Sequence, residues 1–414
     1  MAPSSAFARR TTRAPFAARR LLPLAAVLAA TLPQSGWSDE LDTIQFRAGQ
    51  GFTRDSNVLR IADSIADQGW LGGAGRDDTV SLTTLGAKLD KRYGLQRFEL
   101  DAELQRYAYK TYSSLDFTAF NYSAAWRWSL TPRLHGSIQT QQREYTDNLV
   151  ETRAIGELNR RTDRQSGADA EYELGANWRV VGGVFDRSVK NSQLLTFEND
   201  TQVRGVEAGM RYVLPTGTAL AYRYRLGNGE YPGRIASPWF ATDFKDREHE
   251  FRGEWAPTGK SMVTARLSHL QRRHEGVPQR DFSGVSGQLD ATLNATAKTS
   301  VAAGYVRELE NYQTLTESYY TGNRIFIAPT YKPTEKTAVR VRYDWGQRDF
   351  KGAMPGFASS GRKDDLNTVS LAVEWEPIRA LLVSATLGRE KRKSTQFGQD
   401  YTSNTFGVSA LARF

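Results

Sequence analysis

The sequence contains no cysteine and only four methionines and four histidines among its 414 residues. The absence of cysteine excludes disulfide scaffolds, cysteine nucleophiles and thiolate metal sites. Long apolar runs are scarce as well: the mean hydropathy is −0.55 and 24% of the residues are charged. These values exclude a helical membrane protein, while the length allows two or three soluble domains or one large barrel.

The one continuous apolar run lies near the N-terminus, from Leu21 to Leu32. It is shorter than the roughly 20 residues that a helix needs to cross a bilayer. Small residues follow it, and five arginines precede it (Arg9, Arg10, Arg13, Arg19 and Arg20). This pattern predicts a secretory signal peptide over residues 1–38, cleaved before Asp39. Cleavage after Ala30 and an organelle-targeting peptide are the alternatives.

Loss of this leader changes the charge balance. It removes five of the 55 basic residues and none of the 46 acidic ones, which leaves 50 against 46 and a net charge of +4. No stripe of one sign remains, so the sequence predicts no nucleic-acid partner. It also predicts no cofactor and no metal ion.

Short turns recur along the rest of the chain at intervals of about 40 residues or twice that. They contain Pro132, Pro215, Pro257, Pro333 and Pro377. The flanking segments alternate apolar and polar residues, as in "AVRVRYDW" at 338–345. Such alternation predicts strands with one apolar and one polar face. The predicted strands are 43–53, 79–90, 95–109, 117–129, 133–145, 164–174, 178–190, 201–213, 218–229, 245–255, 261–273, 282–293, 299–311, 321–331, 337–349, 366–376, 380–392 and 402–414.

Short turns alternate with longer polar connections, clearest at 54–78, 146–163, 230–244, 350–365 and 393–401, as in an outer-membrane barrel. Two features favour a membrane barrel over a soluble sandwich. Charges occupy the polar face of nearly every strand, and aromatic residues mark the short-turn side: Trp128, Trp178, Tyr212, Trp255, Tyr331 and Trp375. We therefore predict an all-β fold, a transmembrane antiparallel β-barrel of about 18 strands (16–18) over residues 39–414, in the bacterial outer membrane.

The last ten residues, "TFGVSALARF", are predicted to close the barrel against the first strand near Ile44 to Phe46. Phe406, Val408 and Phe414 would then face lipid. A terminal aromatic residue after such alternation resembles the assembly signal of Gram-negative outer-membrane barrels. The resemblance implies the barrel assembly machinery as a partner.

Charges of both signs are predicted to face the pore, which favours a hydrated polar solute over a strongly selective ion filter. Alternatively, these charges only pair across strands and solvate the wall. A folded-in connection, with 54–78 the longest candidate, is open as a plug. The predicted pore-lining residues are Arg97, Glu99, Asp101, Glu103, Arg127, Arg211, Arg223, Arg225, Arg252, Glu254, Arg340, Arg342, Asp344 and Glu374.

The stretch "DTIQFRAGQGFTRDSNVLRIAD", from Asp42 to Asp63, resembles the opening strand of EpsL-type barrels of exosortase-linked exopolysaccharide clusters, most clearly at "DSNVLR". The resemblance implies a porin-like channel that exports a polysaccharide together with periplasmic and inner-membrane export proteins. A nutrient or sugar porin for small hydrophilic solutes and a surface adhesin are the alternatives. An enzyme is not predicted: His135 would face the lumen, His249 and His269 would face outward, and His274 would lie in a loop.

Overall fold

A computed structural model describes residues 43–65, 75–146, 159–192 and 200–414. The predicted signal peptide lies outside the described residues, and the domain boundary at residue 38 stays a prediction. The strands are β1 Ile44–Asp55, β2 Asp78–Tyr93, β3 Gln96–Tyr109, β4 Phe117–Thr131, β5 Leu134–Thr146, β6 Arg160–Glu173, β7 Trp178–Asn191, β8 Thr201–Val213, β9 Ala219–Glu230, β10 Asp243–Thr258, β11 Ser261–His274, β12 Phe282–Leu293, β13 Thr299–Asn311, β14 Tyr319–Thr334, β15 Thr337–Lys351, β16 Lys363–Ile378, β17 Leu381–Ser394 and β18 Tyr401–Arg413. Short 3-10 helices occupy Ser113–Leu115 and Pro278–Arg280.

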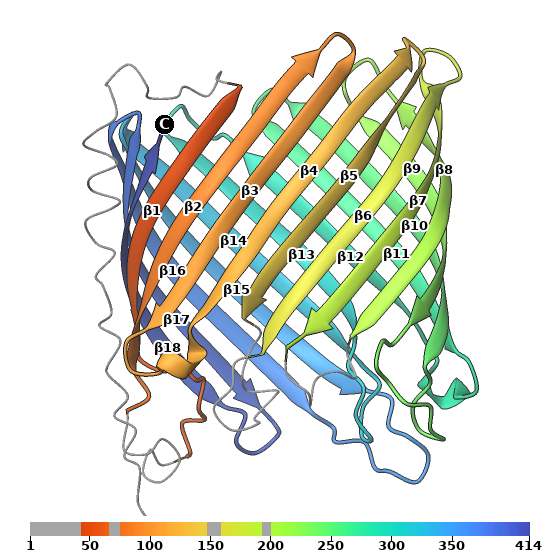
Figure 1. Ribbon diagram of the computed structural model, residues 1–414, viewed down its shortest axis with the longest axis vertical. Coiled ribbons are helices and arrows are strands. Elements are labelled where there is room, and N and C mark those ends of the chain that lie inside the picture. Colours follow the sequence, from red (N-terminus) through yellow and green to blue (C-terminus); the bar gives the residue numbers. More distant parts are fainter. Residues whose placement is uncertain (1–42, 66–74, 147–158, 193–199) are drawn as a thin grey trace, which may run out of the picture. The chain divides into compact units, whose positions relative to one another are not determined.

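The strands form one closed antiparallel sheet of 18, as the sequence predicts (Figure 1). Each strand pairs with its neighbours in the chain, and β1 also pairs with β18, with Arg47 opposite Arg413. Two backbone hydrogen bonds between Phe46 and Phe414, of 2.6 and 2.9 Å, complete this seam. The predicted closure of the last strand on the first is therefore confirmed.

Several strands extend beyond their predicted ends. β6 begins at Arg160 rather than at 164, and β16 spans Lys363–Ile378 rather than 366–376. Pro257, Pro333 and Pro377 lie inside the last residues of β10, β14 and β16, where the pairing register shifts. A β-bulge interrupts the ladder, so a proline without an N–H is tolerated there.

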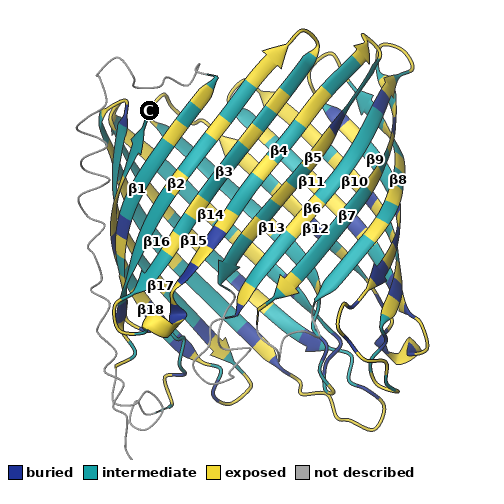
Figure 2. Cartoon of the chain, in the orientation of Figure 1, coloured by how far each residue is buried: buried dark blue, intermediate teal, exposed yellow. Residues whose placement is uncertain are grey.

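The apolar residues of each strand point to one face and remain exposed, for example Leu387 on β17 and Trp375 on β16. Most buried apolar residues lie instead at the end of the barrel with the long connections, which we call the long-loop end (Figure 2). None of the described helices is long and apolar enough to span a membrane.

Candidate functional site: the charged lumen

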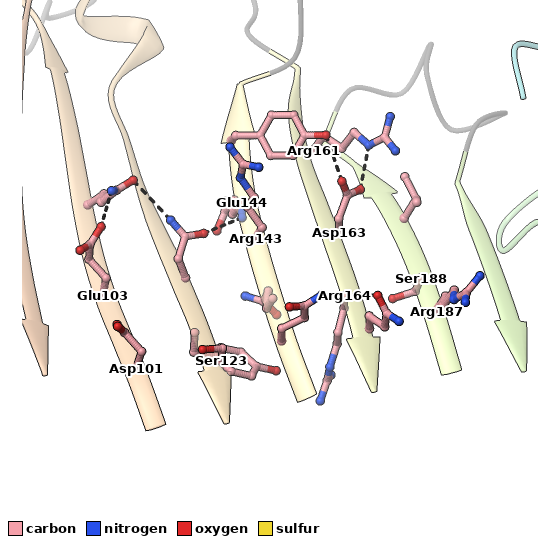
Figure 3. Close-up of a pocket in the computed structure, with 18 of the residues that line it drawn as sticks. Asp101, Glu103, Ser123, Arg143, Glu144, Arg161, Asp163, Arg164, Arg187 and Ser188 are labelled. Carbon is pink, nitrogen blue, oxygen red and sulfur yellow. Dashed lines mark hydrogen bonds and ion pairs between the residues drawn. The ribbon is translucent and has the colours of Figure 1, made fainter. Parts of the chain in front are cut away.

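Charged side chains form the inner face of the barrel wall. One common cavity of ≈ 1090 Å³ is lined by Arg47, Asp101, Arg161, Arg252 and Glu310, which come from β1, β3, β6, β10 and β13. Figure 3 shows Asp101 and Arg161 on its wall. Strands that are not neighbours in the sheet can share a cavity only across the lumen. The charged face therefore points inward and the apolar face points outward.

The predicted pore-lining residues lie on this inner face, each in an ion pair. Asp101 and Glu103 pair with Arg47, while Arg225 and Arg252 pair with Glu250. Arg223 pairs with Glu207 at 2.6 Å. Their part in permeation stays a prediction. The predicted residues that pair with one another are Arg97 and Glu99 at 3.0 Å, Arg127 and Glu99 at 2.9 Å, Arg211 and Glu254 at 3.5 Å, Arg340 and Glu374 at 2.9 Å, and Arg342 and Asp344 at 2.6 Å.

Arg161 and Asp163 also line the cavity, although they are not among the predicted pore-lining residues. The Arg161 Nε donates to Asp163 Oδ1 at 2.8 Å, and the Tyr145 hydroxyl donates to the same carboxylate at 3.0 Å (Figure 3). Both positions fell in a predicted connection because the strand was expected to begin at 164. The alternation of inward residues, continued backward from Asp169, would have identified them.

Several inner carboxylates lie deeper in the wall than the arginines that pair with them. Glu250 is 0% exposed, whereas Arg252, at 2.6 Å, is 45% exposed and Arg266, at 3.6 Å, is 44% exposed. At Asp101 and Glu254 the carboxylate is instead more exposed than the arginine that pairs with it. An arginine side chain keeps its stem on the wall and its charged head in water. Guanidinium groups therefore form much of the surface that faces the cavity at β10 and β11.

Four connections at the long-loop end are joined into one unit, which we call the loop hub: residues 231–242, 275–281, 312–318 and 352–362. Arg280 is fully buried in it and donates to the carbonyl oxygens of Trp239 at 3.1 Å and Glu317 at 2.8 Å. Ala241, Val277 and Met354, from three of these connections, form a small buried apolar cluster. The hub fixes this part of the barrel rim.

The "DSNVLR" stretch lies at the seam between the first and last strands. Arg60 Nη1 donates to Asp55 Oδ2 at 2.7 Å, and Arg60 Nε lies 3.3 Å from the Glu390 carboxylate on β17. Asn57 Nδ2 donates to the carbonyl oxygen of Thr402 on β18 at 3.2 Å. We call Asp55, Asn57 and Arg60 the seam lock, because they tie β1 to both strands at the closing edge.

Comparison with known proteins identifies no matching family model and no matching curated protein. Several solved structures are similar to this chain at low identity. OccK1 (OpdK) of Pseudomonas aeruginosa is 13% identical, with a TM-score of 0.49 over 92% of this chain and 100% of its own. A BenF-like porin of Pseudomonas fluorescens is 12% identical, with a TM-score of 0.49 over 90% and 100%. OccAB3 of Acinetobacter baumannii is 10% identical, with a TM-score of 0.45 over 90% and 99%.

The histidines occupy three kinds of position. His135 faces inward, 3.4 Å from Glu171, while His249 and His269 lie opposite each other on the outer face. His274 is not in a loop, as was expected, but ends β11 and is buried beside the loop hub, 2.8 Å from the Tyr231 hydroxyl. Burial raises the pKa of Tyr231, so its hydroxyl stays protonated and can donate to this imidazole. The described residues contain no group of three or more histidines and carboxylates able to hold a metal ion.

Proposed function

We propose that this chain is a passive, non-enzymatic outer-membrane channel for small hydrophilic solutes, with a preference for anions. Barrels of 16–18 strands leave an aqueous channel when no segment plugs them. The exposed guanidinium groups of Arg252 and Arg266 above the buried Glu250 are the observation that carries the anion preference. Because most inner charges are paired, the preference is expected to be modest.

A planar-bilayer measurement tests this function. The purified protein should conduct, and its reversal potential in a KCl gradient should have the sign of an anion-preferring pore. The R252Q/R266Q variant should shift that potential toward cation preference, because it removes two lumen-facing charges. The R160Q/R204Q variant is the matched control, since Arg160 and Arg204 lie on the outer face. A folded protein that does not conduct would contradict the proposal.

Export of an exopolysaccharide is the second candidate, and it rests on the resemblance of Asp42 to Asp63 to EpsL-type barrels. Asp55 to Arg60 is the part of this stretch that most resembles those barrels, and its residues make contacts that close the seam between the first and last strands. The stretch therefore offers no direct support for a polymer path. Deletion of the gene separates the two functions. Loss of surface polymer with solute uptake intact would favour export, and normal polymer with lost uptake would favour the diffusion channel.

The exposed apolar residues of the outer wall support the proposed location in the outer membrane. Phe406 and Val408 are exposed on the outward face of β18, and the Phe414 ring stacks on Phe46 at 6.4 Å. We propose that this row faces lipid and serves the barrel assembly machinery as its recognition signal. Replacement of Phe414 by serine should lower the amount of barrel in the outer membrane without changing the conductance of each assembled channel. An unchanged amount would contradict the assembly role.

A further inference from the structure

Three cations occupy one outward-facing row on β17, which we call the cation row: Arg389, Lys391 and Lys393. They alternate with Glu390 and Arg392, which face the lumen side. Residues on the neighbouring strands opposite the row are uncharged at Val369, Asn367, Asn404 and Thr402. The one acid opposite it is Asp365, which faces Lys393.

Arg389, Lys391 and Lys393 form no ion pair or hydrogen bond with the described residues, in contrast to the outward cations Lys245 and Arg204 at the same end. Lys245 pairs with Glu275 at 2.8 Å, and Arg204 pairs with Asp186 at 2.9 Å. Two carboxylates beside the row accept hydrogen bonds from uncharged groups. Asp365 accepts one from Gln347 at 2.9 Å, and Asp63 accepts two from Thr402 at 3.0 and 3.1 Å.

The row begins where the apolar outer wall ends. Leu387, the outward residue before Arg389, is 52% exposed, and Phe406 lies opposite it on β18. Along a strand the three cations cover about 13 Å, at roughly 3.3 Å per residue. That length is sufficient for more than one phosphate group. Arginine and lysine at a membrane surface attract anionic head groups, and charge-assisted hydrogen bonds to phosphate are strong.

We propose that the cation row binds the phosphate groups of a membrane lipid whose acyl chains lie against Leu387 and the adjoining apolar wall. The lipid carries at least two phosphates and belongs to the leaflet on the long-loop side. This site is separate from the lumen, so it does not depend on what the channel conducts.

Native mass spectrometry of the purified barrel in detergent, titrated with diphosphorylated lipid A, tests the proposal. The wild type should retain the lipid, and R389Q/K391Q/K393Q should bind it roughly tenfold more weakly or worse. Each single substitution should weaken binding severalfold, so the test does not depend on the triple variant. The control R160Q/R204Q/K245Q removes three outward cations that are already paired with Glu144, Asp186 and Glu275, and it should bind like the wild type.

Two further measurements test which parts of the lipid are needed for binding. Lipid A without phosphates should not be retained, and inorganic phosphate should not displace the diphosphorylated lipid, because the acyl chains contribute to binding. Equal binding by the wild type and the triple variant, or binding that is indifferent to the phosphates, would overturn the proposal. Displacement by inorganic phosphate would contradict the proposal that the ligand is a lipid, because it would show that the row binds phosphate without the acyl chains. Conductance of the same variants should be unchanged, which separates this result from the diffusion function.

Discussion

At the residue scale, Arg60 combines a strained backbone with two ion pairs. Among the described residues it is the one non-glycine with a positive φ, 50°. This conformation costs about 1–2 kcal/mol for a residue with a Cβ. The R60A and R60G variants both lose the ion pairs to Asp55 and Glu390, but glycine also removes the backbone cost. After the entropy of glycine is subtracted, R60G should be about 0.5–1 kcal/mol more stable than R60A. Urea unfolding in lipid vesicles measures the difference, and a more stable R60A would contradict the strain argument.

Asn57 makes the other contacts of the seam lock. It is buried, and its amide donates to the carbonyl oxygens of Ile61 at 2.8 Å and Thr402 at 3.2 Å while accepting from the Ile61 N–H at 2.8 Å. N57A leaves these groups without partners and should lower the free energy of unfolding by about 1–3 kcal/mol. Asn404 lies at the same end with an exposed side chain, so N404A is the control. Equal unfolding temperatures for N57A and the wild type would show that the lock adds no stability.

At the scale of elements, the loop hub behaves as one unit because Arg280 joins connections from different strand pairs. R280M should keep the barrel folded but free the segments 231–242 and 312–318, which lose hydrogen bonds to Trp239 and Glu317. Hydrogen exchange should therefore accelerate in these two segments and remain unchanged in the strands. Gln279 is exposed beside it, and Q279M should leave exchange as in the wild type. Uniform exchange in R280M would mean that the hub does not depend on this arginine.

The elements also show where sequence reasoning succeeds and where it ends. Alternation predicted the strands and the closure, because lipid and water dictate opposite residue types on the two faces of the wall. Beyond the part of the wall that we propose to lie in the membrane, both faces would meet polar surroundings. The pattern weakens there, and the start of β6 was placed too late. The burial of Arg280 and His274 depends on loops that are distant in the sequence. No local pattern predicts such contacts, and a charged loop residue is ordinarily expected to be exposed.

At the scale of the whole barrel, the proposed lipid surroundings take the place of a protein core. The middle of the wall has exposed apolar residues outside and paired charges inside, and most buried apolar residues lie at the long-loop end. Stability in the middle therefore depends on which face a side chain occupies. The substitution of a single residue by arginine, on the outer face in one variant and on the inner face in another, therefore distinguishes the two environments.

Val341 and Thr368 allow this comparison on the paired strands β15 and β16. Val341 faces outward opposite Leu371, and Thr368 faces inward opposite Asp344. V341R places a charge in hydrocarbon and should cost about 2–4 kcal/mol of unfolding free energy. T368R adds the same side chain to the hydrated lumen beside a carboxylate, so its cost should stay below about 1 kcal/mol. Urea titration of both variants in vesicles measures the two costs. Similar losses for the two variants would contradict the assignment of the faces, and with it the charged lumen on which the channel function depends.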